Sequence, residues 1–199
     1  EIRKQRLIDA YQQNHDLFSS PALSNHVSNT SDIYEHGGTI YIVSPWSNSE
    51  TLEDHRCASL RECILLLASM GRVIQRIHEA GYLYLDLKPE NILTIAGSTD
   101  LVQLFDFDSM VSMADLAEQK TVRTSYTKGF APLEQQTGKL KKLGWHSDVY
   151  SLGAVLFYEL WGHTPTAFDC DNNAAFDFEH MAFAGTYQDR LYRELTDFF

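Results

Sequence analysis

The chain has 199 residues, 44% of them hydrophobic, and 16 Lys and Arg against 27 Asp and Glu give it a formal net charge of −11. This length suffices for one domain or two small lobes, and the acidic balance disfavours nucleic acids and acidic membranes as general partners because like charges repel. The longest apolar stretches fall far short of the ~18 residues of a membrane-spanning helix, so we expect a soluble globular protein with no membrane contact in this segment.

The first predicted elements are a helix and a hairpin. Residues 1–18 carry apolar side chains at helical spacing, and a Ser-Ser-Pro sequence ends that helix. Two β-rich runs within residues 32–45 meet at Gly37-Gly38, which predicts a hairpin. The polar stretch 46–55 that follows is typical of a connector.

The chain has three cysteines, Cys57, Cys63 and Cys170. The cysteines form no C-x-x-C pair and have no histidine partners at the spacing of metal ligands. Their odd number also argues against a disulfide framework. We therefore expect reduced, buried thiols in a cytoplasmic protein, without a zinc site.

The strongest helical signal covers residues 59–80. Its apolar side chains recur every three or four residues, which predicts a helix with one buried face, and Gly81 is typical of the residue after a helix C-terminus. The predicted face consists of Leu60, Ile64, Leu67, Val73, Ile74 and Ile77. Two short strands follow at 92–95 and 101–105, separated by the turn-rich sequence AGSTD.

This second hairpin predicts a meeting of two oxygen-bearing side chains. If it is symmetric about its turn, Asn91 lies opposite Asp106, with backbones about 5 Å apart. A carboxamide oxygen and a carboxylate there are suitable ligands for a hard cation such as Mg²⁺. The alternative is an Asn and an Asp that merely end two strands.

Two further side chains precede Asn91 on the loop into the first strand. Asp86 can accept or orient the proton of an attacking hydroxyl, and Lys88 brings positive charge to where a transferring phosphoryl group accumulates negative charge. Phosphoryl transfer depends mostly on positioning and charge stabilisation. The pattern therefore indicates that reaction, with Asp86, Lys88 and Asn91 as catalytic residues and with Asn91 and Asp106 as metal ligands.

Several motifs, in this order, resemble those of the protein kinase family. YLDLKPEN at 84–91 resembles the catalytic loop H-R-D-L-x-x-x-N, and DFD at 106–108 is similar to the metal-binding D-F-G motif. TKGFAPLEQ at 127–135 is similar to the substrate-docking segment that ends in A-P-E, with Glu134 as its glutamate.

The last motif, SDVYSLGAVLFYELWG at 147–162, resembles the buried central helix of the large kinase lobe. In the family the first acid of this helix, here Asp148, hydrogen-bonds the backbone of the catalytic loop. The resemblance implies an α+β, two-lobe protein kinase fold. It places part of the N-lobe in residues 1–44, the hinge in 45–50 and the C-lobe in 51–199.

Residues 41–52 resemble the fifth strand, the hinge and the following helix, especially those of bacterial serine/threonine kinases. The resemblance places Ser44 at the gatekeeper position, which lines the pocket behind adenine. It places Pro45 and Ser47 where a main-chain carbonyl and a main-chain N–H meet adenine, and Leu93 beneath the adenine ring.

The chain departs from the family pattern at three motif positions. Tyr84 replaces the usual His, and Asp108 replaces a Gly whose backbone freedom helps the D-F-G motif to switch. Leu85 replaces the Arg that grips a phosphorylated activation segment, which puts such control in question. The segment nevertheless contains four hydroxyl groups, those of Thr121, Thr124, Ser125 and Tyr126.

The family's glycine-rich loop and V-A-I-K lysine do not precede residue 1, and the chain stops before the arginine that pairs with the glutamate at 134. We therefore expect the sequence to be truncated at both ends relative to the family. The resemblance implies a protein serine/threonine kinase that uses ATP and Mg²⁺ and acts on a protein substrate. The alternatives are a pseudokinase that serves as a scaffold, and a small-molecule phosphotransferase of the aminoglycoside or choline type.

Overall fold

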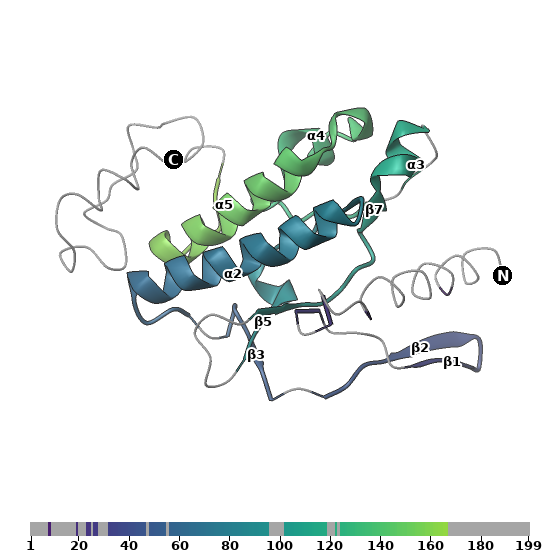
Figure 1. Ribbon diagram of the computed structural model, residues 1–199, viewed down its shortest axis with the longest axis horizontal. Coiled ribbons are helices and arrows are strands. Elements are labelled where there is room, and N and C mark those ends of the chain that lie inside the picture. Colours follow the sequence, from purple (N-terminus) through teal and green to yellow (C-terminus); the bar gives the residue numbers. More distant parts are fainter. Residues whose placement is uncertain are drawn as a thin grey trace.

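Two long helices dominate the computed structural model, α2 (Leu60–Glu79) and α5 (Trp145–Trp161), and Figure 1 shows them side by side. None of the described helices is both long and apolar enough to cross a bilayer. The helix predicted over residues 1–18 lies outside the described residues except for Ile8, which is helical. The structure describes residues 8, 19, 23–24, 26–27, 32–46, 48–54, 56–95, 102–118, 122 and 124–166.

The first predicted hairpin is confirmed. Strands β1 (Asp32–His36) and β2 (Thr39–Val43) pair antiparallel and form a sheet of their own. Gly37 and Gly38 have φ values of 57° and 81°, a left-handed turn that favours glycine at both positions. In Figure 1 this hairpin extends away from the two long helices.

The second predicted hairpin is also confirmed, and it belongs to a three-stranded antiparallel sheet. Strand β5 (Ile92–Thr94) lies between β3 (Glu50–Thr51) and β6 (Val102–Leu104). The predicted connector 46–55 therefore contributes a strand, and its Leu52 is buried in the core. The helix implied after the hinge is wrong for residues 48–54, which form β3 and a turn.

Helix α2 has the ends that its sequence predicts. The Ser59 side chain accepts the Glu62 N–H at 3.2 Å, Glu62 in turn accepts the Ala58 N–H at 2.7 Å, and Gly81 follows the C-terminus with φ 86°. The predicted buried face is only partly right, because Ile64 is 39% exposed and Leu67 is half-buried. The buried positions are Leu60, Cys63, Leu66, Ser69, Met70, Val73, Ile74 and Ile77.

The core lies between α2, α5 and the three-stranded sheet. Ala154 and Val155 of α5 share an apolar cluster with Met70 and Val73 of α2 and with Ile92 of β5. Leu23 and Val27 add to the same cluster, and Val27 bridges to Leu104 of β6. This packing fixes the ends of α2 and α5 relative to the loop that leads into β5.

Shorter elements surround the C-terminal end of α2. Strand β4 (Tyr82–Leu83) pairs with β7 (Val111–Ser112), and the short helix α3 (Met113–Ala117) follows β7. Helix α4 (Leu133–Gln136) and the 3-10 turns η1 (Pro89–Asn91) and η2 (Leu140–Lys142) complete the described elements.

Candidate active site

The loop between β4 and β5 gathers the three predicted catalytic residues. Asp86 is buried, and its Oδ2 accepts hydrogen bonds from Lys88 Nζ at 3.0 Å and from Asn91 Nδ2 at 2.9 Å. Asn91 Nδ2 also donates to the Asp86 main-chain oxygen at 3.0 Å. Pro89 begins the turn η1, where its missing N–H is not needed, and this turn brings Asn91 back beneath Asp86.

A fourth side chain joins this group from 36 residues beyond Asn91. Thr127 Oγ1 donates to Asp86 Oδ1 at 3.2 Å and accepts from Lys88 Nζ at 3.2 Å. The segment that precedes α4 is thereby fixed to the catalytic loop. Sequence reasoning did not identify this contact, because Thr127 lies far from the loop in sequence and its spacing from α4 gives no signal for it.

The expected contact of Asp148 is confirmed. This side chain is 0% exposed, and it accepts the N–H of Tyr84 at 3.0 Å and of Leu85 at 2.7 Å. His78 Nε2 lies 2.7 Å from Asp148 Oδ2, so the end of α2 joins the same group. Leu85 has a φ of 64°, which costs a non-glycine residue about 1–2 kcal/mol. The carboxylate stabilises that strained backbone.

Gln135 holds the same loop from the other side. Its buried Nε2 donates to the Leu85 carbonyl at 2.7 Å and to the Ser125 carbonyl at 2.7 Å. One amide therefore connects the catalytic loop with the segment before α4. One usable signal that sequence reasoning missed is the polar residue directly after Glu134, at a position that α4 turns toward the core.

The side chain of Leu85, which replaces the family's phosphate-binding Arg, lies in an apolar cluster. Its side chain is buried with Leu83, Val111 and Leu143, and Val122 packs against this cluster. The segment before α4 therefore contacts the catalytic loop through apolar packing here and through the amide of Gln135. Neither contact needs a phosphate group.

Tyr84 connects the catalytic loop to the end of β6. It is fully buried, its hydroxyl donates to the Phe105 carbonyl, and its ring packs edge-on against Phe107 at 5.7 Å between centroids. Burial first, and then the negative charges of Asp86, Asp106 and Asp148, raise its pKa well above the usual 10.0. Tyr84 is therefore a neutral hydrogen-bond donor, and the usual His is replaced by a residue that still ties the two motifs together.

The predicted pairing of Asn91 with Asp106 is wrong by one residue. The strands pair Ile92 with Leu104, and the Phe105 N–H donates to the Asn91 carbonyl at 3.3 Å. Asp106 lies one position further, where φ is 60° and the chain leaves the strand. The left-handed backbone, and not strand alternation, determines the direction of this side chain.

The oxygen atoms at this place nevertheless suit a divalent cation. The side-chain nitrogen of Asn91 donates to Asp86. Its Oδ1 atom is therefore the one that can bind a cation. Partial burial first, and then the charge of Asp108, raise the pKa of Asp106 above 3.8, with a smaller contribution from Asp86. This concentration of negative charge is what a hard cation would relieve.

The predicted adenine-binding residues are more scattered. Leu93 is half-buried on β5, two residues beyond Asn91, and pairs with Thr51 and Gln103. Ser44 and Pro45 are exposed after β2, and no hydrogen bond within the described part of the chain joins them to the loop. Ser47 lies outside the described residues.

Glu134 is anchored at the start of α5. Ser147 Oγ donates to its Oε1 at 3.1 Å, and His146 Nε2 lies 3.2 Å from the same oxygen. The Ser147 hydroxyl also accepts the Gly144 N–H at 3.3 Å. The glutamate therefore fixes α4 to the first turn of the helix that carries Asp148.

Comparison with known proteins gives matches to protein kinases. The family model described as protein kinase domain matches residues 4–195. Human ribosomal protein S6 kinase alpha-1 is 30% identical over 145 residues, which cover 68% of this chain and 19% of that protein. Mouse ribosomal protein S6 kinase alpha-2 is 32% identical over the same shares. The chain thus spans about a fifth of the length of these curated relatives.

Two further kinases are also similar. Smooth muscle myosin light chain kinase of Gallus gallus is 28% identical over 130 residues, covering 62% of this chain and 7% of that protein. The solved twitchin kinase region from C. elegans superposes with a TM-score of 0.67 and 24% identity, over 83% of this chain and 29% of that chain. This structural likeness concerns the fold.

Proposed function

The chain belongs to the protein kinase family and has its fold, and from this premise we propose that the protein transfers the γ-phosphate of ATP to serine or threonine hydroxyls of proteins. The observation that carries the proposal is the convergence of Lys88, Asn91 and Thr127 on the buried carboxylate of Asp86. Three donors hold this carboxylate in one orientation, as a group that steers a substrate hydroxyl must be held.

Each residue of the group has a defined task in this proposal. Asp86 accepts a hydrogen bond from the substrate hydroxyl and takes its proton as the oxygen attacks phosphorus. Lys88 places its ammonium beside the group that accumulates negative charge, and Thr127 keeps Asp86 and Lys88 at their spacing. Asn91 closes the loop beneath Asp86 through its side-chain nitrogen, and its Oδ1 is the atom we assign to the cation.

Protein kinases use ATP together with a divalent cation, and we propose Mg²⁺ here, held by Asn91 Oδ1 and the Asp106 carboxylate. When bound, such a cation supplies positive charge to the phosphate oxygens. A hard cation suits these oxygen ligands better than a sulfur-binding metal would. Ser44, Pro45, Ser47 and Leu93 stay our predictions for the adenine contacts.

A protein substrate is favoured over a small molecule by the contacts of the segment before α4. Thr127 and Gln135 hold this segment against the catalytic loop, so it provides a peptide-docking surface beside Asp86. A small-molecule phosphotransferase does not need a peptide-docking surface beside its catalytic aspartate. A cytoplasmic location, as proposed from the reduced thiols, agrees with a supply of ATP.

The test is phosphate transfer from labelled Mg-ATP by the full-length protein and its Asp86→Asn variant. We expect the variant to lose about 10²–10⁴-fold in kcat and to bind ATP as the parent does. Asp54→Asn, an exposed carboxylate away from the loop, is the matched control and should retain full activity. Equal turnover by Asp86→Asn and the parent would remove the assigned role of Asp86.

The same assay separates the alternatives. A parent protein that binds Mg-ATP, seen as a rise in melting temperature, and transfers no phosphate is a pseudokinase. Faster transfer to aminoglycosides or choline than to any protein identifies a small-molecule phosphotransferase. Phosphate on serine or threonine of protein substrates supports the proposal.

A further inference from the structure

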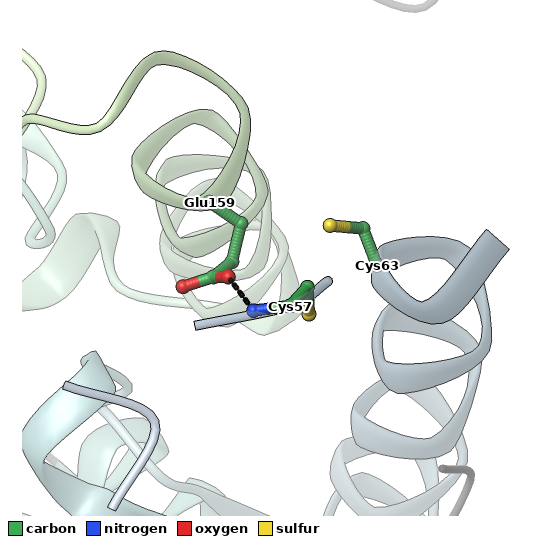
Figure 2. A group of neighbouring side chains, drawn as sticks. All are labelled: Cys57, Cys63 and Glu159. Carbon is green, nitrogen blue, oxygen red and sulfur yellow. Dashed lines mark hydrogen bonds between the residues drawn. The ribbon is translucent and has the colours of Figure 1, made fainter. Parts of the chain in front are cut away.

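A second cluster of reactive side chains lies at the other end of the α2–α5 pair, away from the candidate active site. Cys57 precedes α2, Cys63 lies in its first turns, and Glu159 lies near the C-terminus of α5. Figure 2 shows the Cys63 sulfur directed from its helix toward Glu159, with Cys57 on the short segment between the two helices. The candidate active site uses none of these three residues.

The cluster has the dimensions of a metal site. One ligand atom from each residue, two sulfurs and a carboxylate oxygen, lie within 4.8 Å of one another. Among the residues that the structure describes, these three are the one such group of His, Cys, Asp and Glu side chains. Cys63 is 1% exposed and Glu159 2%, while Cys57 is half-buried and gives access from solvent.

Glu159 is a buried acid with incomplete compensation. Its Oε2 accepts the Cys57 N–H at 3.0 Å. Its Oε1 accepts no hydrogen bond and lies 3.5 Å from Arg56 Nε. A buried carboxylate with an oxygen in this state is costly unless another positive partner is present. A cation held by the two sulfurs beside Glu159 would supply that positive partner.

Arg56 lies beside the Glu159 carboxylate, and its position is set by hydrogen bonds to main-chain oxygens of α5. Its Nη2 donates to the main-chain oxygens of Tyr158 at 2.7 Å and Glu159 at 2.9 Å, and its guanidinium lies 4.6 Å from the centre of the Tyr158 ring. Arg56 is therefore fixed by α5 itself. It orients the Glu159 carboxylate as outer partners orient the ligands of metal sites.

In place of the sequence-based expectation of no zinc site, we propose that Cys57, Cys63 and Glu159 bind a thiophilic divalent cation of the zinc class, with water as the fourth ligand. Two thiolates and one carboxylate are a ligand set for zinc, whereas Mg²⁺ and Ca²⁺ prefer oxygen ligands alone. On binding, both thiols lose their protons to solvent and two metal–sulfur bonds form, with no change of oxidation state. The proposal is independent of the proposed kinase activity.

Occupation of the site requires only a small movement. Zinc–sulfur bonds of about 2.3 Å at tetrahedral angles place two sulfurs about 3.8 Å apart, so ligand atoms up to 4.8 Å apart approach by about 1 Å. Cys57 lies in the irregular segment before α2 and can make that movement while Cys63 and Glu159 stay on their helices. The bound cation ties this segment to both helices.

The competing interpretation is a redox-active thiol pair. Such a pair needs two sulfurs alone, whereas here an oxygen of the buried Glu159 carboxylate lies within 4.8 Å of both sulfurs. A disulfide would also leave the Glu159 carboxylate with only the Arg56 ion pair and the Cys57 N–H as partners among the described residues. The geometry therefore favours metal binding over oxidation.

The test uses the untagged chain, freed of metal with a chelator, kept reduced and titrated with Co²⁺ as the probe. We expect saturation at one Co²⁺ per chain, with a thiolate-to-cobalt charge-transfer band and the visible bands of tetrahedral cobalt. Zn²⁺ should then displace the cobalt and bleach both bands. Zn²⁺ should also raise the melting temperature of the parent chain.

Conservative variants assign the ligands. Loss of outer partners costs metal sites about 10–100-fold in affinity, so we expect Cys57→Ser and Cys63→Ser each to weaken Co²⁺ binding by at least about 100-fold. Glu159→Gln, which keeps the shape of the side chain, should weaken it by at least about tenfold. Glu53→Gln, an exposed carboxylate before the same segment, is the control and should bind like the parent.

Several results would overturn the proposal. One is a reduced parent chain that binds no Co²⁺ and instead forms a Cys57–Cys63 disulfide in air. Another is a charge-transfer band that survives either serine variant. Parent-like affinity in Glu159→Gln, with the variant folded by circular dichroism, would remove the carboxylate from the site and overturn the three-ligand arrangement.

Discussion

Replacing Asp148 with alanine should destabilise the catalytic loop more than any exposed substitution. The change leaves the buried N–H groups of Tyr84 and Leu85 without acceptors, and each unsatisfied donor costs about 1–3 kcal/mol. It also removes the hydrogen bonds that hold the Leu85 backbone in its strained conformation, where φ is 64°. We expect a loss of about 4 kcal/mol in the free energy of unfolding, a large part of the 5–15 kcal/mol typical of folded domains.

Two matched variants sharpen this expectation. Asp148→Asn keeps one oxygen acceptor but turns an amide nitrogen toward a donor, so we expect a smaller loss of about 2 kcal/mol. Asp54→Asn changes an exposed carboxylate that accepts a hydrogen bond from the Thr51 hydroxyl, and it should stay within about 0.5 kcal/mol of the parent.

Urea unfolding followed by circular dichroism measures the free energies, and amide hydrogen exchange at residues 84 and 85 locates the effect. Exchange at these two amides should accelerate in Asp148→Ala well before global unfolding. An unfolding midpoint equal to that of Asp54→Asn, or amides at 84 and 85 that stay protected, would refute the assigned role of Asp148.

Two further predictions concern the departures from the family motifs. Asp108→Asn removes a charge that raises the pKa of Asp106, so a carbon-13 NMR titration should show that pKa lower than in the parent. Because the folded-state pKa of Asp106 is raised, its protonated form stabilises the fold at pH values below the ordinary value of 3.8. This contribution is lost as the pH rises through the folded-state pKa. The free energy of unfolding of Asp108→Asn should therefore fall less over this pH range than that of the parent. Leu85→Arg forces a charge into an apolar cluster, and we expect about 2–4 kcal/mol of destabilisation in urea unfolding, against under about 1.5 for Leu85→Met. Equal midpoints for these two variants would contradict the burial of Leu85.

Local signals in the sequence sufficed for the first hairpin and for the ends of α2. Gly37 and Gly38 accept left-handed angles, and Ser59 and Gly81 act within one turn of the helix they delimit. The face that α2 buries was not fully predictable, since it depends on where a distant helix crosses it. The helices cross at Gly71, where an added Cβ atom would lie 3.8 Å from Cδ2 of Leu152 in α5. This crossing leaves Ile64 at the exposed edge of the contact.

The catalytic loop was predictable because its residues lie close together in sequence, and the turn η1 folds Asn91 onto Asp86. The strand register was not, because symmetry about the turn is a guess and the observed pairing differs by one position. The family resemblance predicted the contact of Asp148, whereas Thr127 and Gln135 reach the loop over 41 and 50 residues. Periodicity carries no information over such separations.

The two buried acids of α5 explain how one helix positions two sites. Asp148 and Glu159 are eleven residues apart, which places them about 16 Å apart along the helix and within about 20° of the same face. Each accepts main-chain N–H groups from an irregular segment that flanks α2, at residues 84–85 on one side and at Cys57 on the other. Because the rest of α5 is largely apolar, these carboxylates find their donors in the two segments, and both ends of α2 are thereby fixed to α5. Two acids in a largely apolar helix are visible in the sequence alone, and the cost of burying them unpaired requires such partners. The physical requirement that holds the catalytic loop in place therefore also brings Glu159 to the two cysteines.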